Sequence, residues 1–193
     1  MQEFTLPKMN VVKSLIILST TVSAVTWPNE RKLNSIIDDI TRGVRSFDSS
    51  IQALTDCVCN MLQAPLKPLM PTAAIRNQFE IIHTASLALY ATVQAVESNF
   101  STAESAYIVS VMEETLVVDI LKALNLIRQR KHFINAMGQS QDMLDDLNIL
   151  LGDHLNLSVE LSQWLAPSQN TAATTAFNTI TDAIEDTINL YSI

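Results

Sequence analysis

Few residues in this 193-residue chain have the types and spacing that catalysis requires. The three histidines, His83, His132 and His154, are dispersed, and none has a second histidine four residues away to form a helical metal-binding pair. A Gly-x-Ser-x-Gly elbow, a phosphate-binding loop and a dinucleotide-binding loop are all missing from the sequence. We therefore expect no enzyme activity, no metal and no cofactor.

Paired acids could suggest acid–base chemistry, but their spacing argues against it. Asp38-Asp39, Glu113-Glu114 and Asp145-Asp146 are adjacent residues, and neighbours on a helix point about 100° apart, so the two carboxylates of each pair do not converge. We interpret them as solvated helix faces. His83 is predicted to be a hydrogen-bonded residue at the edge of an apolar face, and His132 to lie in a solvated basic helix end.

Three isolated hydroxyls have a pattern more suggestive of ligand binding. Ser86, Thr115 and Ser158 stand where their helices otherwise present aliphatic side chains. Each hydroxyl could bond the carbonyl one turn earlier in its own helix, as serine and threonine often do. Alternatively, the three could orient the head of an amphiphile in a mostly apolar pocket. The sequence leaves both interpretations open.

Helical periodicity predicts the elements that position these side chains. Apolar residues recur every three or four positions, only three glycines are present, and no strand pattern competes. Pro65, Pro68 and Pro71 exclude a continuous helix through residues 64–70. We predict an all-α fold, an antiparallel four- to five-helix bundle with a long N-terminal helix. The expected helices span residues 28–63, 72–98, 101–130, 140–165 and 170–191.

Local signals define the third helix and the exposed face of the first. Ser101 and Glu104 form a capping box, which predicts a helix start. The basic run 128–132 suits the end of that helix, where cations oppose the negative terminus. On the first helix, Asp48 is predicted to lie on the wet face with other charged residues. The expected apolar face of the third helix comprises Tyr107, Ile108, Val111, Thr115, Val118, Leu121 and Leu124.

The N-terminal residues have the layout of a secretory signal. Residues 1–24 contain Lys8 and Lys13, a short apolar run and small residues ending at Ala24. The apolar run is too short for a transmembrane helix, so we expect cleavage after Ala24 and one domain over residues 25–193. Cleavage removes two cations and one acid, so 12 basic and 20 acidic residues become 10 and 19. The resulting charge of −9 disfavours nucleic acid as a partner.

Two further sequence features, the cysteines and the sequons, matter if the protein is secreted. Cys57 and Cys59 are the only cysteines, and two residues apart on a helix they cannot pair with each other. They are either two helix residues, at least one of them buried as a small apolar side chain, or the source of an intermolecular disulfide. Asn99 and Asn156 each begin an Asn-x-Ser sequon and are candidate glycosylation sites.

The order of these patterns resembles the fungal hydrophobic surface-binding protein A family, which includes cell-wall galactomannoproteins. The resemblance covers roughly residues 34–191. It implies a secreted, all-helical domain that adsorbs to hydrophobic surfaces and, in some relatives, encloses fatty acids. This chain lacks the proline that relatives often have in the third helix, which predicts one straight helix over residues 101–130. The segments that carry the resemblance are 37–40, 47–48, Leu54, 82–85, 100–105, 121–124, 130–133 and 144–167.

We therefore predict a secreted, non-enzymatic protein of the cell wall or medium that binds fatty acids, other lipids or hydrophobic surfaces. The alternative is a structural or antigenic wall mannoprotein or effector with a filled core, which acts through a secreted enzyme or a host protein. Leucine and isoleucine line a filled core and a lipid cavity equally well, so the sequence does not separate the two. The candidate ligand-binding residues are Ile40, Phe47, Ile82, Ser86, Leu89, Val111, Thr115, Val118, Leu147, Leu151 and Ser158.

Overall fold

The computed structural model describes residues 28–60 and 70–192, and residues 36–193 form one compact unit, to which the following description applies. The predicted signal sequence and the proline-rich connection at 61–69 lie outside the described residues. In the described part every regular element is helical, so the predicted all-α class is confirmed. The elements are α2 (Pro28–Asn60), α3 (Met70–Gln94), α4 (Thr102–Val111), η1 (Met112–Val117), α5 (Val118–Gln129), α6 (Lys131–Ala136), α7 (Ser140–Ser162), η2 (Pro167–Gln169) and α8 (Asn170–Tyr191).

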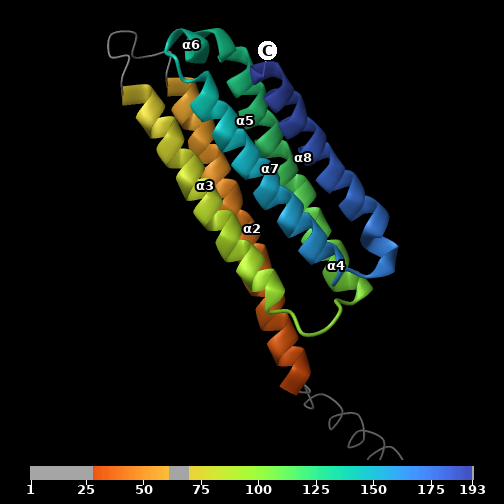
Figure 1. Cartoon of the computed structure of the whole chain (residues 1–193). Helices are drawn as coiled ribbons and strands as arrows, with labels where there is room; N and C mark the ends of the chain where they lie inside the picture. Colours follow the sequence, from red (N-terminus) through yellow and green to blue (C-terminus); the bar gives the residue numbers. More distant parts are fainter. Residues whose placement is uncertain (1–27, 61–69, 193) are drawn as a thin grey trace, which may run out of the picture. The chain divides into compact units, whose positions relative to one another are not determined.

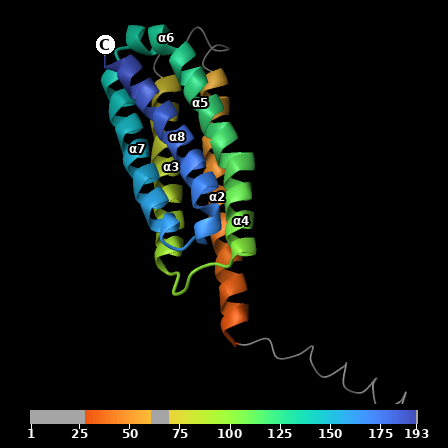
Figure 2. The ribbon, with the colours of Figure 1, turned by 90° about the vertical axis from the view of Figure 1, so that its right-hand side faces the viewer.

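Five rods form a closed ring in this unit (Figures 1 and 2). Helix α3 packs against α7, α7 against α8, and α8 against the continuous rod made by α4, η1 and α5. Helix α2 lies between that rod and α3, in contact with both. The chain alternates in direction from one rod to the next, but the ring neighbours α3 and α7 run parallel, as do α5 and α8. Helices that follow each other in the sequence are therefore antiparallel, whereas some helices that are neighbours in the ring are parallel.

The third rod contains a π-helical turn at its middle. η1 separates α4 from α5 without breaking the rod, and residues 112–117 follow the wider π pattern. A π turn accommodates an extra residue, so the side chains after it emerge at a different angle from those of a regular α-helix. The rod is therefore a single continuous structure over residues 102–129, but not the regular straight helix that the sequence predicted.

The buried face of this rod differs from the predicted one because of that turn. Ile108 and Val111 are buried as expected, but Tyr107 and Val118 are 47 % and 55 % exposed. The prediction that Val118 faces the interior is wrong, because it assumed regular α-helical spacing across the π turn. The buried positions beyond Val111 are Met112, Leu116, Ile120, Ala123, Leu124 and Ile127.

Side-chain bonds join the ends of the ring. The Ser101–Glu104 capping box is present at the start of α4, as predicted. At the same end, the Ala166 N–H donates to the Ser105 hydroxyl at 2.9 Å, which links α4 to the turn before η2. At the opposite end, the Tyr191 hydroxyl donates to the Ile127 carbonyl at 3.0 Å, linking α8 to α5. None of the described helices combines the length and apolarity needed to cross a bilayer.

The link through Ser105 generates a stability prediction. Ser105 is fully buried, so a Ser105→Ala variant leaves the Ala166 N–H without an acceptor in a site closed to water. We expect a loss of about 1–3 kcal/mol in the free energy of unfolding, measured by urea denaturation. Ser49→Ala is the matched control, because Ser49 is exposed and bonds only the Arg45 carbonyl of its own helix. Equal stability of the two variants would contradict the role assigned to Ser105.

Candidate ligand-binding site

Most of the predicted lining residues lie in the interior of the ring. Val111 is 7 % exposed, whereas Leu151 is only half-buried, near the edge of the apolar face of α7. Val118 is the one candidate on the outside. The structure therefore brings the predicted aliphatic candidates into one core, with Val118 as the exception. The most deeply buried, each at most 1 % exposed, are Ile40, Phe47, Ile82, Leu89 and Leu147.

The three candidate hydroxyls have different environments. Thr115 donates to the Val111 carbonyl at 2.7 Å and Ser158 to the Leu155 carbonyl at 2.9 Å, so each is satisfied within its own helix. Ser86 is 1 % exposed on the buried stripe of α3, and its hydroxyl has no hydrogen-bond partner among the described residues. Of the three candidate hydroxyls, Ser86 is therefore the one that a polar ligand group could bond without displacing a partner in its own helix.

An open groove runs along the outside of the seam between α2 and α3. One part has a volume of about 530 Å³ and a second part about 510 Å³, and the two share Ser46, Ala85 and Ala88. Small side chains on both helices create the depression. At its floor Gly43 approaches Leu89 so closely that an added β-carbon would lie 2.8 Å from the leucine Cδ1. The groove has a volume typical of ligand sites, but it lies outside the core that contains Ser86.

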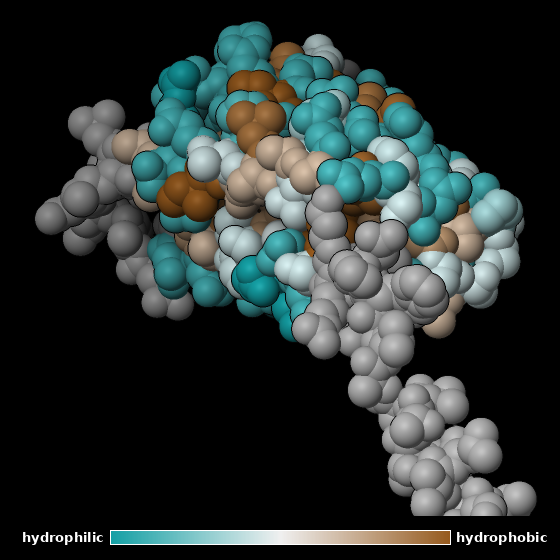
Figure 3. All heavy atoms as spheres, turned by 90° about the horizontal axis from the view of Figure 1, so that it is seen from below, coloured by the Kyte–Doolittle hydropathy of each residue, from teal (hydrophilic) through white to brown (hydrophobic). Residues whose placement is uncertain are grey.

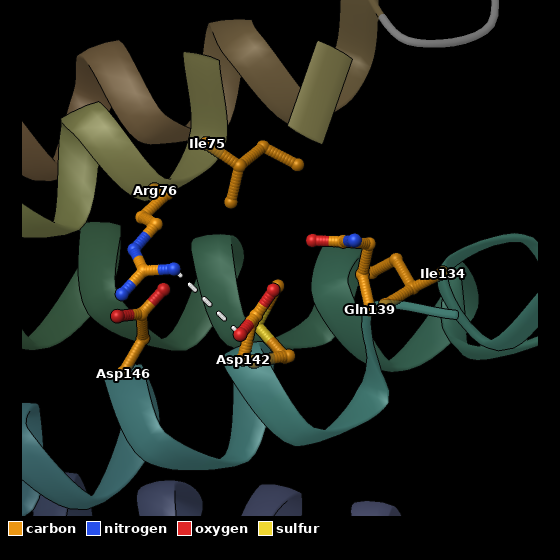
Figure 4. Close-up of a pocket in the computed structure, with 7 residues that line it drawn as sticks. Ile75, Arg76, Ile134, Gln139, Asp142 and Asp146 are labelled. Atoms are coloured by element: carbon orange, nitrogen blue, oxygen red, sulfur yellow. Dashed lines mark ion pairs between the residues drawn. The ribbon is translucent and has the colours of Figure 1, made fainter. Parts of the chain in front are cut away.

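Ionic side chains cross the seam between α3 and α7 near a small pocket of about 20 Å³ (Figure 4). Arg76 on α3 points toward Asp142 and Asp146 on α7, with 3.7 Å between the Arg76 and Asp142 charged atoms. Burial raises the pKa of Asp146 to about 6, Arg76 lowers it, and the neighbouring acids Asp142, Asp145 and Glu80 raise it further. The pocket is large enough for about one water molecule, so it suits no organic ligand.

A second polar link in the same seam joins His83 to Asp153. Their Nδ1 and Oδ2 atoms are 2.7 Å apart, with His83 half-exposed and Asp153 buried. Burial raises the pKa of Asp153, whereas the bond and charge of His83 lower it. The prediction of a hydrogen-bonded boundary histidine at 83 is therefore confirmed. His154 is buried, its Nε2 lies 3.0 Å from the Phe177 carbonyl, and burial lowers its pKa, so it is a neutral structural residue.

The structure corrects the prediction for Asp48. This residue is 5 % exposed and lies at the seam between α2 and α5, not on a wet face. The Gln52 amide donates to Asp48 at 2.9 Å and to Asp119 at 2.8 Å. Sequence reasoning missed this cluster, because a helix in a ring contacts two neighbours and buries more than one stripe. The i,i+4 spacing of Asp48 and Gln52 was the sequence signal for this cluster, because residues four apart are neighbours on a helix.

Several apolar and modifiable side chains remain at the surface. Viewed from below, the space-filling structure has hydrophobic patches among hydrophilic residues (Figure 3). Asn99 and Asn156 are exposed, in the turn before α4 and on α7, and their glycosylation stays a prediction. Cys59 is an exposed free thiol and Cys57 a half-buried one, and burial raises the pKa of the Cys57 thiol. The exposed large apolar residues are Ile81, Leu87, Tyr107, Val118, Phe133, Ile149, Leu155 and Val159.

Residues 36–193 thus form a five-helix ring whose aliphatic interior contains the Ser86 hydroxyl. The sequence profile of hydrophobic surface binding protein A matches residues 31–163. The chain belongs to this family. A comparison with curated protein sequences finds no match.

Solved structures share the fold at low sequence identity. AFMP4P in complex with palmitic acid superposes with a TM-score of 0.73 at 19 % identity, covering 80 % of this chain and 99 % of that chain. Ligand binding domain 1 of the Penicillium marneffei MP1 protein, complexed with arachidonic acids, has a TM-score of 0.64 at 14 % identity, covering 83 % of this chain and 97 % of that one. Domain 2 of the same protein, complexed with multiple arachidonic acids, has a TM-score of 0.64 at 16 % identity, covering 83 % and 94 %.

The environment of Asp146 predicts a pH-dependent stability. A carboxyl whose folded-state pKa is raised to about 6 favours folding below its unfolded pKa near 3.8, and that contribution is lost as the pH rises through 6. Replacing Asp146 by Asn removes this loss. We expect D146N to match the native protein at pH 4 and to melt at a higher temperature than it at pH 7, measured by circular dichroism.

The neighbouring residue supplies the control for that measurement. Asp145 is exposed, and its replacement by Asn leaves the buried carboxyl in place. The D145N variant should follow the native pH profile. A D146N profile parallel to the native one from pH 4 to pH 7 would contradict the assignment.

Proposed function

We propose that this protein binds long-chain fatty acids in the interior of its helix ring, and that it performs no catalysis. The observation that carries the proposal is the unpaired hydroxyl of Ser86, 1 % exposed within the aliphatic core. A carboxyl group placed there would supply the missing hydrogen bond, while the acyl chain lies among the core side chains. Membership of the hydrophobic surface binding family and the fatty-acid complexes of the similar folds support this ligand class.

The main driving force would be transfer of the acyl chain out of water. Burial of apolar surface contributes roughly 25 cal/mol per Å², so an alkyl chain gains most of its affinity without directional contacts. The single hydroxyl would then fix the orientation of the chain. This division between a large apolar wall and one polar contact is typical of small-molecule sites.

Uptake requires the ring to open, because the candidate lining residues are packed against one another in the described state. The ligand would select a minor population in which two neighbouring rods have separated. The same opening would expose the apolar stripes and let the protein adsorb to a hydrophobic surface. Exposed apolar residues such as Ile81 on α3 and Val159 on α7 offer first contacts for adsorption.

We place this activity outside the cell, as a secreted or wall-associated protein. The secretory layout of residues 1–24, the two exposed sequons at Asn99 and Asn156, and the family support that location. Binding of a secreted enzyme or a host protein stays a prediction of the sequence.

Palmitate titration of the purified protein, followed by native mass spectrometry and by tryptophan fluorescence, tests the proposal. We expect a stoichiometric complex in the native protein. In a Ser86→Ala variant the affinity should fall about tenfold, because one hydrogen bond to a carboxylate is lost. The variant should be as stable as the native protein or more stable without ligand, since it removes an unpaired buried hydroxyl.

Two further variants separate the interior from the outer groove. Ala88→Trp fills the groove between α2 and α3 without reaching Ser86, because Ala88 is exposed and lines both parts of it. Thr175→Ala is the matched hydroxyl control, since Thr175 is exposed and bonds the Thr171 carbonyl of its own helix. Both should bind palmitate with native affinity. Loss of binding in A88W with full binding in S86A would place the ligand in the groove instead.

A further inference from the structure

Two carboxyl groups face each other at the seam between α2 and α5. Asp48 and Asp119, here called the acid pair, both accept from the Gln52 amide nitrogen, at 2.9 and 2.8 Å. Gln52 is thereby fully used as a donor, with one N–H for each carboxylate. The two acids come from different rods, and they are held side by side by a group that has no positive charge.

The buried member of the pair lacks one hydrogen bond. Asp48 is 5 % exposed, and its Oδ1 atom is buried with no partner in the described structure. A charged carboxylate in that position would keep an unpaired oxygen away from water beside a second carboxylate, which is costly. A proton on Oδ1 removes the charge and turns the same atom into a donor toward Asp119.

No cation in the described part of the chain compensates this charge. Burial, followed by the charge and hydrogen bond of Asp119, raises the pKa of Asp48 to about 6, while the Gln52 bond lowers it. Arg45 precedes Asp48 by three residues on α2, and its guanidinium donates to the Tyr107 hydroxyl on α4 at 3.5 Å. The charged and titratable side chains on the helices around the pair include Arg42, Arg45, Asp56 and Cys57 on α2, Tyr107 on α4, Glu113 and Glu114 on η1, and Lys122 on α5.

We propose that the acid pair is a proton-operated clasp that controls ligand uptake through the seam between α2 and α5. With one shared proton, Asp48 donates to Asp119 and the two rods stay together. With both carboxylates ionised, they repel each other and the seam opens more often. This inference rests on the proposed function, because it assigns a regulated opening to the same interior site.

The position of the pair connects it to that interior. Asp48 follows Phe47 directly, and Asp119 precedes Ile120, and both of these apolar side chains are at most 1 % exposed. Separation of α2 from α5 at the acid pair would therefore uncover core side chains on both rods. Ser86 lies on the buried stripe of α3, the other ring neighbour of α2, and faces the same core.

The direction of the pH effect follows from the protonation states. If Asp48 has a pKa of about 6 in the closed ring and near 3.8 when the seam is open, closure is favoured below pH 4 and that advantage is lost as the pH rises through 6. Uptake should therefore be faster at pH 7 than at pH 4.5. With these two pKa values, the open population changes roughly 25-fold between pH 4.5 and pH 7.

The test measures the uptake rate of a fluorescent long-chain alcohol by stopped flow, since an alcohol headgroup does not titrate in this range. We expect the native protein to take up the probe roughly 25-fold faster at pH 7 than at pH 4.5. An Asp48→Asn variant keeps the shape and supplies a permanent donor toward Asp119, so it should be slow at both pH values. Asp56→Asn, an exposed site on the same helix, should behave like the native protein.

A second measurement keeps the two proposals distinguishable. A carbon-13 NMR titration of the aspartate side chains should give Asp48 an apparent pKa of about 6, well above its ordinary value of 3.8, in the native protein with or without ligand. Equal uptake rates at both pH values, or an Asp48 pKa at its ordinary value, would overturn the clasp. Failure of the probe and of palmitate to bind at any pH would refute the proposed function, and the NMR titration would then still decide whether the shared proton exists.

Discussion

The ring closes only because its third rod keeps one apolar stripe directed inward along its whole length. That stripe is Ile108, Met112, Leu116 and Ile120, at steps of four residues. In a regular α-helix each four-residue step overshoots a full turn by about 40°, so three steps rotate the stripe by about 120° out of the core. The π turn at residues 112–117 absorbs this rotation. Without it, α8 and α2 could not both pack against the same rod.

The seams between the rods contain polar contacts, unlike the interior of the ring. The interior is mostly aliphatic, whereas polar side chains bridge four of the seams. His83 and Asp153 join α3 to α7, and Gln52 joins α2 to α5. His154 joins α7 to the Phe177 carbonyl of α8, and Tyr191 joins α8 to the Ile127 carbonyl of α5. An apolar seam has no preferred register, but a hydrogen-bonded polar pair does, so these bridges specify how far each rod slides along its neighbour. The acid pair differs from the other bridges because it joins two carboxyl groups, so its strength depends on a proton.

Local chemistry predicted where the helices of this fold begin and end. It predicted only in part which of their side chains point into the core. The capping box at Ser101 and the last helix follow from interactions within a few residues. The exposure of Tyr107 and Val118 does not, because it depends on a π turn that tertiary packing selects. The repeated four-residue spacing from Ile108 to Ile120 was the sequence signal for the π turn. In a regular α-helix, the apolar residues of one face alternate between spacings of three and four.

The candidate site was predictable to the same degree. The aliphatic candidates are core residues as their periodicity required, but a single sequence contains no information about which hydroxyl remains unpaired. Thr115 and Ser158 found acceptors in their own helices, and Ser86 did not. Asp48 was misassigned because the wet face of an isolated helix becomes a seam once the ring supplies a second neighbour. The burial of such residues depends on how the helices assemble into the ring, and no local sequence pattern predicts that assembly.

The Ser86 hydroxyl links the core to the proposed ligand. Thr115 and Ser158 bond carbonyls of their own helices, whereas the Ser86 hydroxyl makes no such bond, so a ligand carboxyl would bond it without displacing a partner. Under the proposed function, that bond would add to the hydrophobic contribution of the acyl chain. A filled aliphatic core and a lipid site would then be two states of one packing, separated by the opening of one seam.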